Sequence, residues 1–229
     1  MAVTLHERIG SGGFGTVYRA TDDLNRTVAV KVISRSAAQS SSALEHARAL
    51  ARVDHPHVVT IYRVEAVTDP EDGLTADGVV MEFVDGPTLA SRVATARLSV
   101  DELRAIGLAI ISAMKALHDN GVAHRDLHED NVLLGSKGVK VIDVLYREQD
   151  SLRLLSGRGR EELLGRDLEA LRRLITFAIR NSELKPAQAD GFARAAVSAA
   201  DVEGVGDAFR AVLETPSPLD TESPAVLTA

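Results

Sequence analysis

A glycine-rich stretch near the start of the chain constrains its fold more than any other feature. The segment Gly10-Ser11-Gly12-Gly13-Phe14-Gly15 has the spacing G-x-G-x-x-G. In dinucleotide-binding folds this spacing opens a helix, but the residues that follow here, 16–20, are β-prone. We therefore predict strands over residues 4–9 and 16–20, joined by a turn that glycine makes easily. With a third strand over residues 27–34, the sequence predicts an antiparallel meander and no dinucleotide-binding unit.

A loop in the second half carries the side chains with the clearest chemistry. Residues 124–131 are His-Arg-Asp-Leu-His-Glu-Asp-Asn, with Asp126 and Asn131 five residues apart. The Asp126 carboxylate can orient an attacking hydroxyl and accept its proton, and the Asn131 amide oxygen can ligate a Mg²⁺ ion that bridges nucleotide phosphates. A predicted hairpin over residues 132–142 then delivers a second carboxylate, Asp143. These residue types in this order favour phosphoryl transfer.

Composition excludes several other classes of function. The 229 residues are 45% hydrophobic and 26% charged, which is typical of a soluble globular protein. The net charge of −7 disfavours nucleic acid as a partner. Without cysteine, the chain has no disulfide, thiolate metal site or cysteine nucleophile. We find no signal peptide and no apolar run of the roughly 20 residues that a membrane span requires, so we expect no membrane contact and a cytoplasmic location.

The pattern of predicted elements divides the chain into two lobes. Strands dominate residues 1–85, whereas helices dominate residues 86–214. The longest predicted helix covers residues 100–120, with Ser99 as its N-cap and Glu102 completing a capping box. Residues 215–229 are rich in proline and serine, and we expect them to be disordered.

Five short motifs in one order resemble the eukaryotic-like (Hanks-type) Ser/Thr protein kinases of bacteria over residues 5–180. They are the glycine turn, Val28-Ala29-Val30-Lys31, His124-Arg125-Asp126, Asn131 and Asp143. The intervals also match the family, with 95 residues from Lys31 to Asp126 and 17 from Asp126 to Asp143. The resemblance implies an α+β, two-lobed protein kinase-like fold, with an antiparallel β-rich N-lobe (1–85) and a mainly helical, shortened C-lobe (86–214).

The resemblance also assigns roles to individual residues, with ATP and Mg²⁺ as cofactors. The catalytic group would be Asp126, supported by Lys31, Glu45 and His128, and the metal ligands would be Asn131 and Asp143. The backbone of residues 82–84 would hydrogen-bond adenine, and Met81 would control the pocket behind it. The implied nucleotide-binding residues are Gly10, Ser11, Gly12, Gly13, Phe14, Gly15, Val17, Ala29, Lys31, Met81, Glu82, Val84 and Leu133.

Four departures from the family pattern limit what the resemblance implies. Counting back from His55 without a gap puts His46, and not Glu45, at the position of the glutamate that pairs with the strand lysine. His128 replaces the lysine two residues after the catalytic aspartate, as in some small-molecule kinases of the aminoglycoside phosphotransferase type. The sequence after Asp143 is Val-Leu where the family has Phe-Gly, and no A-P-E motif follows.

The next family landmark is Asp167, within residues 165–171. The resemblance places it at the start of the central C-lobe helix, where it would bind the backbone of the catalytic loop. From Asp167 we predict that this helix continues to about Arg180.

Three functions therefore stay open. The first is a Ser/Thr protein kinase that transfers the γ-phosphate of ATP to a protein hydroxyl. The second is a small-molecule kinase with a hydroxyl substrate. The third is a nucleotide-binding pseudokinase that regulates a protein partner. The full set of polar groups favours the first, His128 favours the second, and Val144 favours the third.

Overall fold

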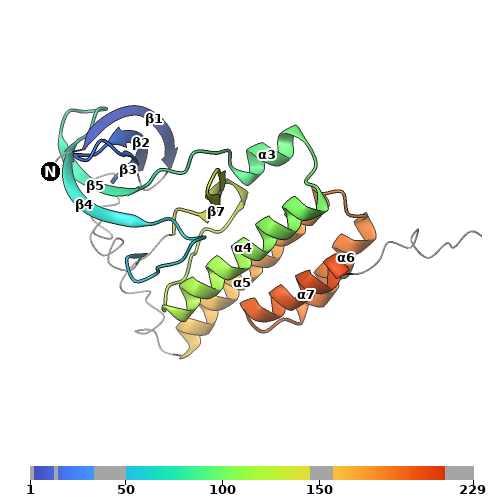
Figure 1. Ribbon diagram of the computed structural model, residues 1–229. Helices are drawn as coiled ribbons and strands as arrows, with labels where there is room; N and C mark the ends of the chain where they lie inside the picture. The colour runs from blue at the N-terminus through green and yellow to red at the C-terminus, as the bar shows by residue number, and fades with distance from the viewer. Residues whose placement is uncertain (1–2, 13–14, 34–49, 145–156, 215–229) are drawn as a thin grey trace, which may run out of the picture.

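The computed structural model describes residues 3–12, 15–33, 50–144 and 157–214. Figure 1 shows a β-sheet lobe at one end and a helical lobe at the other, joined through the chain that follows strand β5. This arrangement confirms the predicted two-lobed α+β fold. Within the described residues, no helix is both long and apolar enough to cross a membrane.

The N-lobe is a five-stranded antiparallel sheet with the strand order β1-β2-β3-β5-β4. One face of β2 and β3 forms a small core together with Val67 and Val80. The residues of this face in the core are Tyr18, Val28, Val30 and Val32. Since side chains alternate along a strand, Ala29 and Lys31 lie on the opposite face, toward the helical lobe. The strand bounds are Thr4–Gly12 (β1), Gly15–Thr21 (β2), Thr27–Ile33 (β3), Ile61–Thr68 (β4) and Thr75–Glu82 (β5).

The glycine turn is a hairpin between β1 and β2, as predicted, but β1 extends three residues beyond Ile9. Gly10 pairs with Val17, and Gly12 pairs with Gly15. Gly15 has φ +143°, and a Cβ atom there would lie 2.0 Å from the carbonyl oxygen of Val32. Only glycine fits this approach of β2 to β3.

The C-lobe is built on two long helices, α4 and α5, and the shorter helices α6 and α7 pack beside them (Figure 1). Ser99 and Glu102 form the predicted capping box at the start of α4. Gly107 of α4 allows close packing of α7, because a Cβ atom there would lie 2.3 Å from the Phe209 ring. The elements are α3 (Leu89–Thr95), α4 (Val100–Asp119), the 3₁₀ turn η1 (Glu129–Asn131), β6 (Val132–Gly135), β7 (Gly138–Val141), α5 (Gly157–Arg180), α6 (Pro186–Val197) and α7 (Val202–Glu214).

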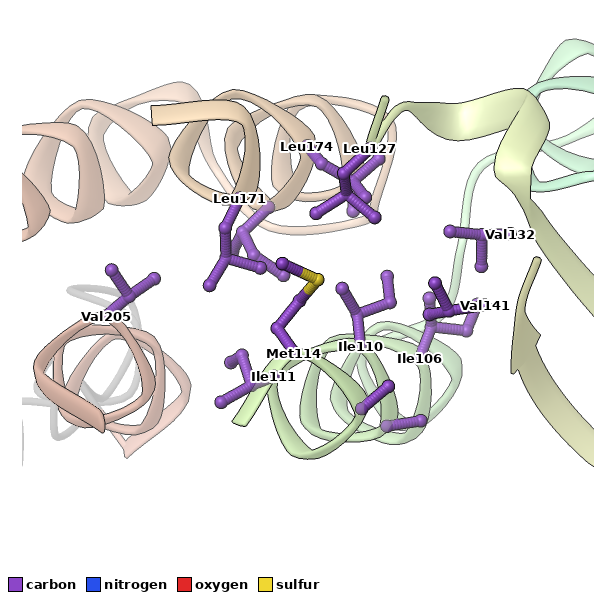
Figure 2. Packing of buried hydrophobic residues seen from close by; sticks show 14 of the residues in the cluster. Ile106, Ile110, Ile111, Met114, Leu127, Val132, Val141, Leu171, Leu174 and Val205 are labelled. Atoms are coloured by element: carbon purple, nitrogen blue, oxygen red, sulfur yellow. The ribbon is translucent and has the colours of Figure 1, made fainter. Parts of the chain in front are cut away.

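The main core links these helices to the loop that carries Asp126. Figure 2 shows Leu127 of this loop beside Leu174 of α5, while Val132 and Val141 of the β6–β7 hairpin lie over α4. All four side chains are buried. The loop is therefore anchored by apolar contacts to the two longest helices of the lobe.

The structure corrects the predicted start of the central helix. We predicted that it begins near Asp167, but α5 begins at Gly157. The predicted start came from the resemblance of Asp167 to the first residues of the family's central helix. In the structure the helix continues through Gly165, and an exposed ion pair one turn apart, Glu162 with Arg166, spans that position.

A short segment, residues 57–60, is hydrogen-bonded to both lobes. The backbone N–H of Val141 donates to His57 O (2.8 Å), and that of Val59 donates to Val141 O (3.0 Å). On the other side, Glu82 N–H donates to Thr60 O (2.9 Å). This segment therefore holds the end of β5 close to the β6–β7 hairpin.

Candidate active site

The His124–Asn131 loop starts from a tightly defined helix end. After α4, Gly121 has φ +74°, which lets the chain reverse. His124 is fully buried, and Arg125 has φ +72°, which is uncommon for a residue with a side chain. Such strained backbone persists only where surrounding contacts hold it.

Asp167 of α5 supplies those contacts. Its carboxylate is 1% exposed and accepts hydrogen bonds from the backbone N–H groups of His124 (2.7 Å) and Arg125 (2.8 Å), and from Nε2 of His118 (2.9 Å). Burial alone would raise the pKa of Asp167, but the hydrogen bonds from His118 and the two amides outweigh it and lower the pKa below its ordinary value. The predicted contact between Asp167 and the loop backbone is confirmed.

His118 is a partner that sequence reasoning missed. It lies in the last turn of α4, 49 residues before Asp167. A single histidine in an amphipathic helix gives no signal of such a contact in the sequence. Only the packing of α4 against α5 brings the two side chains together.

Inside the loop, the carboxylate of Asp126 and the side-chain amide of Asn131 lie side by side. Burial lowers the pKa of His124, so its neutral ring can accept the backbone N–H of Asp126 at Nδ1 (3.3 Å). The Asn131 Nδ2 group donates to the carbonyl oxygen of Asp126 (2.8 Å) and is 3.5 Å from the Asp126 carboxylate. The Asp126 side chain is 48% exposed, whereas Asn131 is 7% exposed. The carboxylate thus faces solvent beside a fixed amide.

The second carboxylate, Asp143, lies next to this loop. The backbone N–H of Ile142 donates to Asn131 O (3.0 Å), so the end of the hairpin is attached to the loop. Asp143 has φ +59°. The next residue, Val144, is fully buried in the core. These contacts turn the Asp143 side chain away from the core and toward the N-lobe.

Lys31 of β3 completes the group from the other lobe. Its Nζ forms an ion pair with Oδ1 of Asp143, although 112 residues separate them in the sequence. Lys31 is 5% exposed, and Asp143 is 36% exposed at its side chain. The structure therefore brings together four of the predicted site residues, Lys31, Asp126, Asn131 and Asp143.

The oxygen atoms of this group suit Mg²⁺. Because Asn131 Nδ2 donates to Asp126 O, the Oδ1 atom of Asn131 is the end of the amide that can bind a cation. Mg²⁺ is commonly held by one or two protein oxygen ligands together with substrate phosphates. In the described part of the chain there is no cluster of three acidic, histidine or cysteine side chains for a metal. A metal here would therefore bind together with a phosphate.

The predicted adenine-contacting residues come from both lobes. Val17 pairs with Lys31 across β2 and β3, and Ala29 pairs with Met81 across β3 and β5. Leu133 of β6 pairs with Lys140 of β7, whose side chain reaches the end of β5. The partly exposed Val17, Met81, Val84 and Leu133 and the buried Ala29 thus surround the junction of the lobes.

Lys140 is a further residue that sequence reasoning missed. It is 8% exposed, and its Nζ lies 2.7 Å from Oε2 of Glu82 and 3.5 Å from the carbonyl oxygen of Val58. Glu82 is predicted to contact adenine through its backbone, but its N–H already donates to Thr60 O. The ion pair holds the Glu82 side chain against the hairpin.

Three predicted site residues, Gly13, Phe14 and Glu45, lie outside the described residues. The interaction of Glu45 with Lys31 therefore stays a prediction. The expected disorder of residues 215–229 also concerns a part of the chain that the structure does not describe.

The family model of the protein kinase domain matches residues 3–144, which is more than half of the chain. The chain belongs to the protein kinase family. A solved structure, the PknI kinase domain of Mycobacterium tuberculosis, covers 92% of this chain and 95% of its own chain with a TM-score of 0.64 and 22% identity. That likeness supports the kinase fold.

Curated relatives agree with the family assignment. The probable serine/threonine-protein kinase PknB of Lactococcus lactis is 37% identical over 145 residues, covering 60% of this chain and 22% of its own length. The NUAK family SNF1-like kinase 1 of Homo sapiens is 31% identical over 164 residues, covering 67% of this chain and 24% of its own length. The chain thus spans about a quarter or less of the length of these relatives.

The connections that follow Asp143 are short in the sequence. Only residues 144–156 separate Asp143 from α5. The family model ends at residue 144 as well. Only residues 181–185 connect α5 with α6. The shortened C-lobe, with a short segment after Asp143, therefore stays a prediction.

Proposed function

We propose that this chain is an ATP- and Mg²⁺-dependent Ser/Thr protein kinase, which transfers the γ-phosphate of ATP to a protein hydroxyl. The observation that carries the proposal is the convergence of Lys31 from the N-lobe with Asp143, Asn131 and Asp126 from the C-lobe. The family membership and the names of the relatives support it.

Each residue has a separate task in this proposal. Lys31 and the backbone of residues 10–15 hold the nucleotide phosphates, and Asn131 and Asp143 hold the metal. Bound Mg²⁺ supplies charge neutralisation for the phosphoryl group in the transition state. Asp126 orients the acceptor hydroxyl and accepts its proton, because its exposed carboxylate stands next to the amide that holds the metal.

The nucleotide base would lie between the lobes in this proposal. Val17 and Ala29 would contact it from the N-lobe, and Leu133 from the C-lobe. Glu82 N–H donates to Thr60 O, so adenine would use the carbonyl oxygen of Glu82 and the backbone of the next two residues. Met81 would control the space behind the base. We also propose residues 1–85 and 86–214 as the two lobes.

A small-molecule kinase is the second candidate. The short segment of residues 144–156 and the direct connection of α5 to α6 favour it, because they leave little chain to dock a peptide. His128 favours it as well. A pseudokinase with a regulatory protein partner is the third candidate, and the buried Val144 at the position of the family's phenylalanine is the observation that favours it.

Intact-mass spectrometry after incubation with Mg-ATP and a mixed protein substrate tests the proposal. A protein kinase should add phosphate groups to itself or to the substrate, and Asp126→Asn should prevent this. Asp130→Asn, which changes an exposed carboxylate in the same loop, serves as the matched control and should stay active. If the protein binds ATP and transfers phosphate to a small hydroxyl compound but not to any protein, the small-molecule kinase replaces the protein kinase as the proposed function.

The remaining expectations are part of the proposal. The absence of cysteine fits a reducing compartment, and we propose a cytoplasmic protein that acts without nucleic acid and without a membrane. The identity of the hydroxyl acceptor follows from the mass-spectrometry experiment.

A further inference from the structure

His128 occupies a defined position between the catalytic carboxylate and the metal-binding amide. It directly precedes the turn η1, with extended backbone at φ −155° and ψ 176°. Its Nε2 atom lies 3.0 Å from Asn131 Nδ2 and 3.7 Å from Oδ2 of Asp126. The side chain is 41% exposed, whereas the Asn131 beneath it is nearly buried.

The orientation of the Asn131 amide determines what His128 can do there. Nδ2 of Asn131 lies 2.8 Å from the carbonyl oxygen of Asp126, and a carbonyl oxygen only accepts hydrogen bonds. The group facing that oxygen must therefore be the NH₂ end of the amide. Since the same NH₂ faces His128 at 3.0 Å, the Nε2 atom of His128 must be the acceptor.

A neutral imidazole accepts through one ring nitrogen and donates through the other. His128 Nδ1 also lies 3.3 Å from the backbone N–H of Asp130, and one neutral ring cannot accept in both places. The contact with Asn131 is shorter and involves the side chain whose orientation Asp126 already determines. We therefore assign the acceptor to Nε2 and the hydrogen to Nδ1.

We propose that His128 is a positioning residue, which accepts a second hydrogen bond from Asn131 Nδ2 and thereby helps the Asp126 carbonyl oxygen to hold Asn131 Oδ1 toward the metal. This inference rests on the proposed function, because it assumes that Asn131 binds Mg²⁺. It differs from the role that the sequence suggested, a cation near the transferring phosphate. A lysine at position 128 has no acceptor for the NH₂ group of Asn131.

Four substitutions separate this role from the others. His128→Gln keeps an acceptor near the place of Nε2, whereas His128→Asn places an acceptor only near Nδ1, where it can accept from the backbone N–H of Asp130 at the start of η1. His128→Lys supplies a cation, and His128→Ala removes every polar atom. His6→Ala, an exposed histidine that contacts Thr21 in the N-lobe, is the control.

The main measurement is the affinity for Mn²⁺, followed by electron paramagnetic resonance with a non-hydrolysable ATP analogue bound. Loss of a hydrogen-bond partner of a metal ligand typically weakens metal affinity about 10- to 100-fold. We expect the Mn²⁺ affinity of the Asn, Ala and Lys variants to fall about 10-fold or more, and that of the Gln variant to stay within about 3-fold of the parent's. The Mg²⁺ concentration for half-maximal phosphate transfer should change in the same order.

The other outcomes have distinct meanings. If the Lys variant keeps the Mn²⁺ affinity of the parent and the Gln variant loses it, His128 acts as a cation and the positioning role is overturned. Loss in the Gln variant with retention in the Asn variant would show that only the cap on η1 matters. If the parent protein binds no Mn²⁺ with the nucleotide, the proposed function fails together with this inference.

Discussion

The contact between Asp167 and the loop leads to a quantitative prediction for Asp167→Asn. The carboxylate is 1% exposed and accepts three hydrogen bonds of 2.7, 2.8 and 2.9 Å. An asparagine keeps one acceptor oxygen and turns an NH₂ group toward at least one of the buried donors. Hydrogen bonds to a charged group contribute about 1.5–3 kcal/mol each, and an unsatisfied buried donor costs about 1–3 kcal/mol. We therefore expect the free energy of unfolding to fall by about 3–5 kcal/mol.

Urea unfolding followed by circular dichroism measures this change. With a slope of about 3 kcal/mol per molar urea, the midpoint should fall by about 1–2 M. The matched control is Glu169→Gln, two residues further along α5, because Glu169 and Arg173 form an exposed ion pair with side chains 65% and 67% exposed. Such pairs contribute about 0.2–1 kcal/mol. Equal midpoints for the two variants would refute our account of Asp167.

The same contact predicts the pH dependence of stability. The pKa of Asp167 is lowered in the folded protein, so its contribution to stability is present above the ordinary carboxyl pKa and is lost as the pH falls through the folded value. The difference in stability between the parent and Asp167→Asn should thus be constant near neutral pH and shrink below about pH 4. A difference that grows in acid would contradict the sign of this argument.

Three further substitutions test the site. Asp143→Ala should abolish Mg²⁺-dependent ATP turnover and leave the fold intact by circular dichroism, because this side chain is partly exposed and holds a metal in our proposal. Lys31→Met should lower the rate of phosphate transfer far more than the affinity for adenosine; equal losses would count against a phosphate-binding role. Lys140→Met leaves the Glu82 carboxylate, 18% exposed, without its ion-pair partner, so it should destabilise the protein by about 1–3 kcal/mol in urea unfolding. Lys137→Met, in the exposed turn between β6 and β7, is its control and should change stability by less than about 0.5 kcal/mol.

Local features of the fold were predictable because they depend on neighbouring residues. The capping box at Ser99 needs only Glu102, three residues later. The hairpin at the glycine turn was predictable because β-prone segments stand on both sides of it. The start of α5 was predicted wrongly, because the resemblance places it at Asp167 and the residues before Asp167 give only weak local signals, such as an exposed ion pair worth about a few tenths of a kcal/mol.

The residues of the candidate site were also predicted from the sequence. Asp126, Asn131, Asp143 and Lys31 stand at the spacing of a known family, and the structure places them in one group. Their supporting residues were not evident. His118 and Lys140 act through contacts with residues that are distant in the chain, and neither belongs to a pattern that a sequence can display.

The sequence by itself therefore determined the candidate site residues and the local elements, because side-chain type and hydrogen bonding over a few residues decide both. The tertiary structure alone decided which groups meet. Lys31 and Asp143 pair across 112 residues, and Asp167 holds a loop that lies 42 and 43 residues before it. Such contacts form only when the apolar faces of α4, α5 and the β6–β7 hairpin pack together, since that burial stabilises the strained backbone at Arg125 and Asp143.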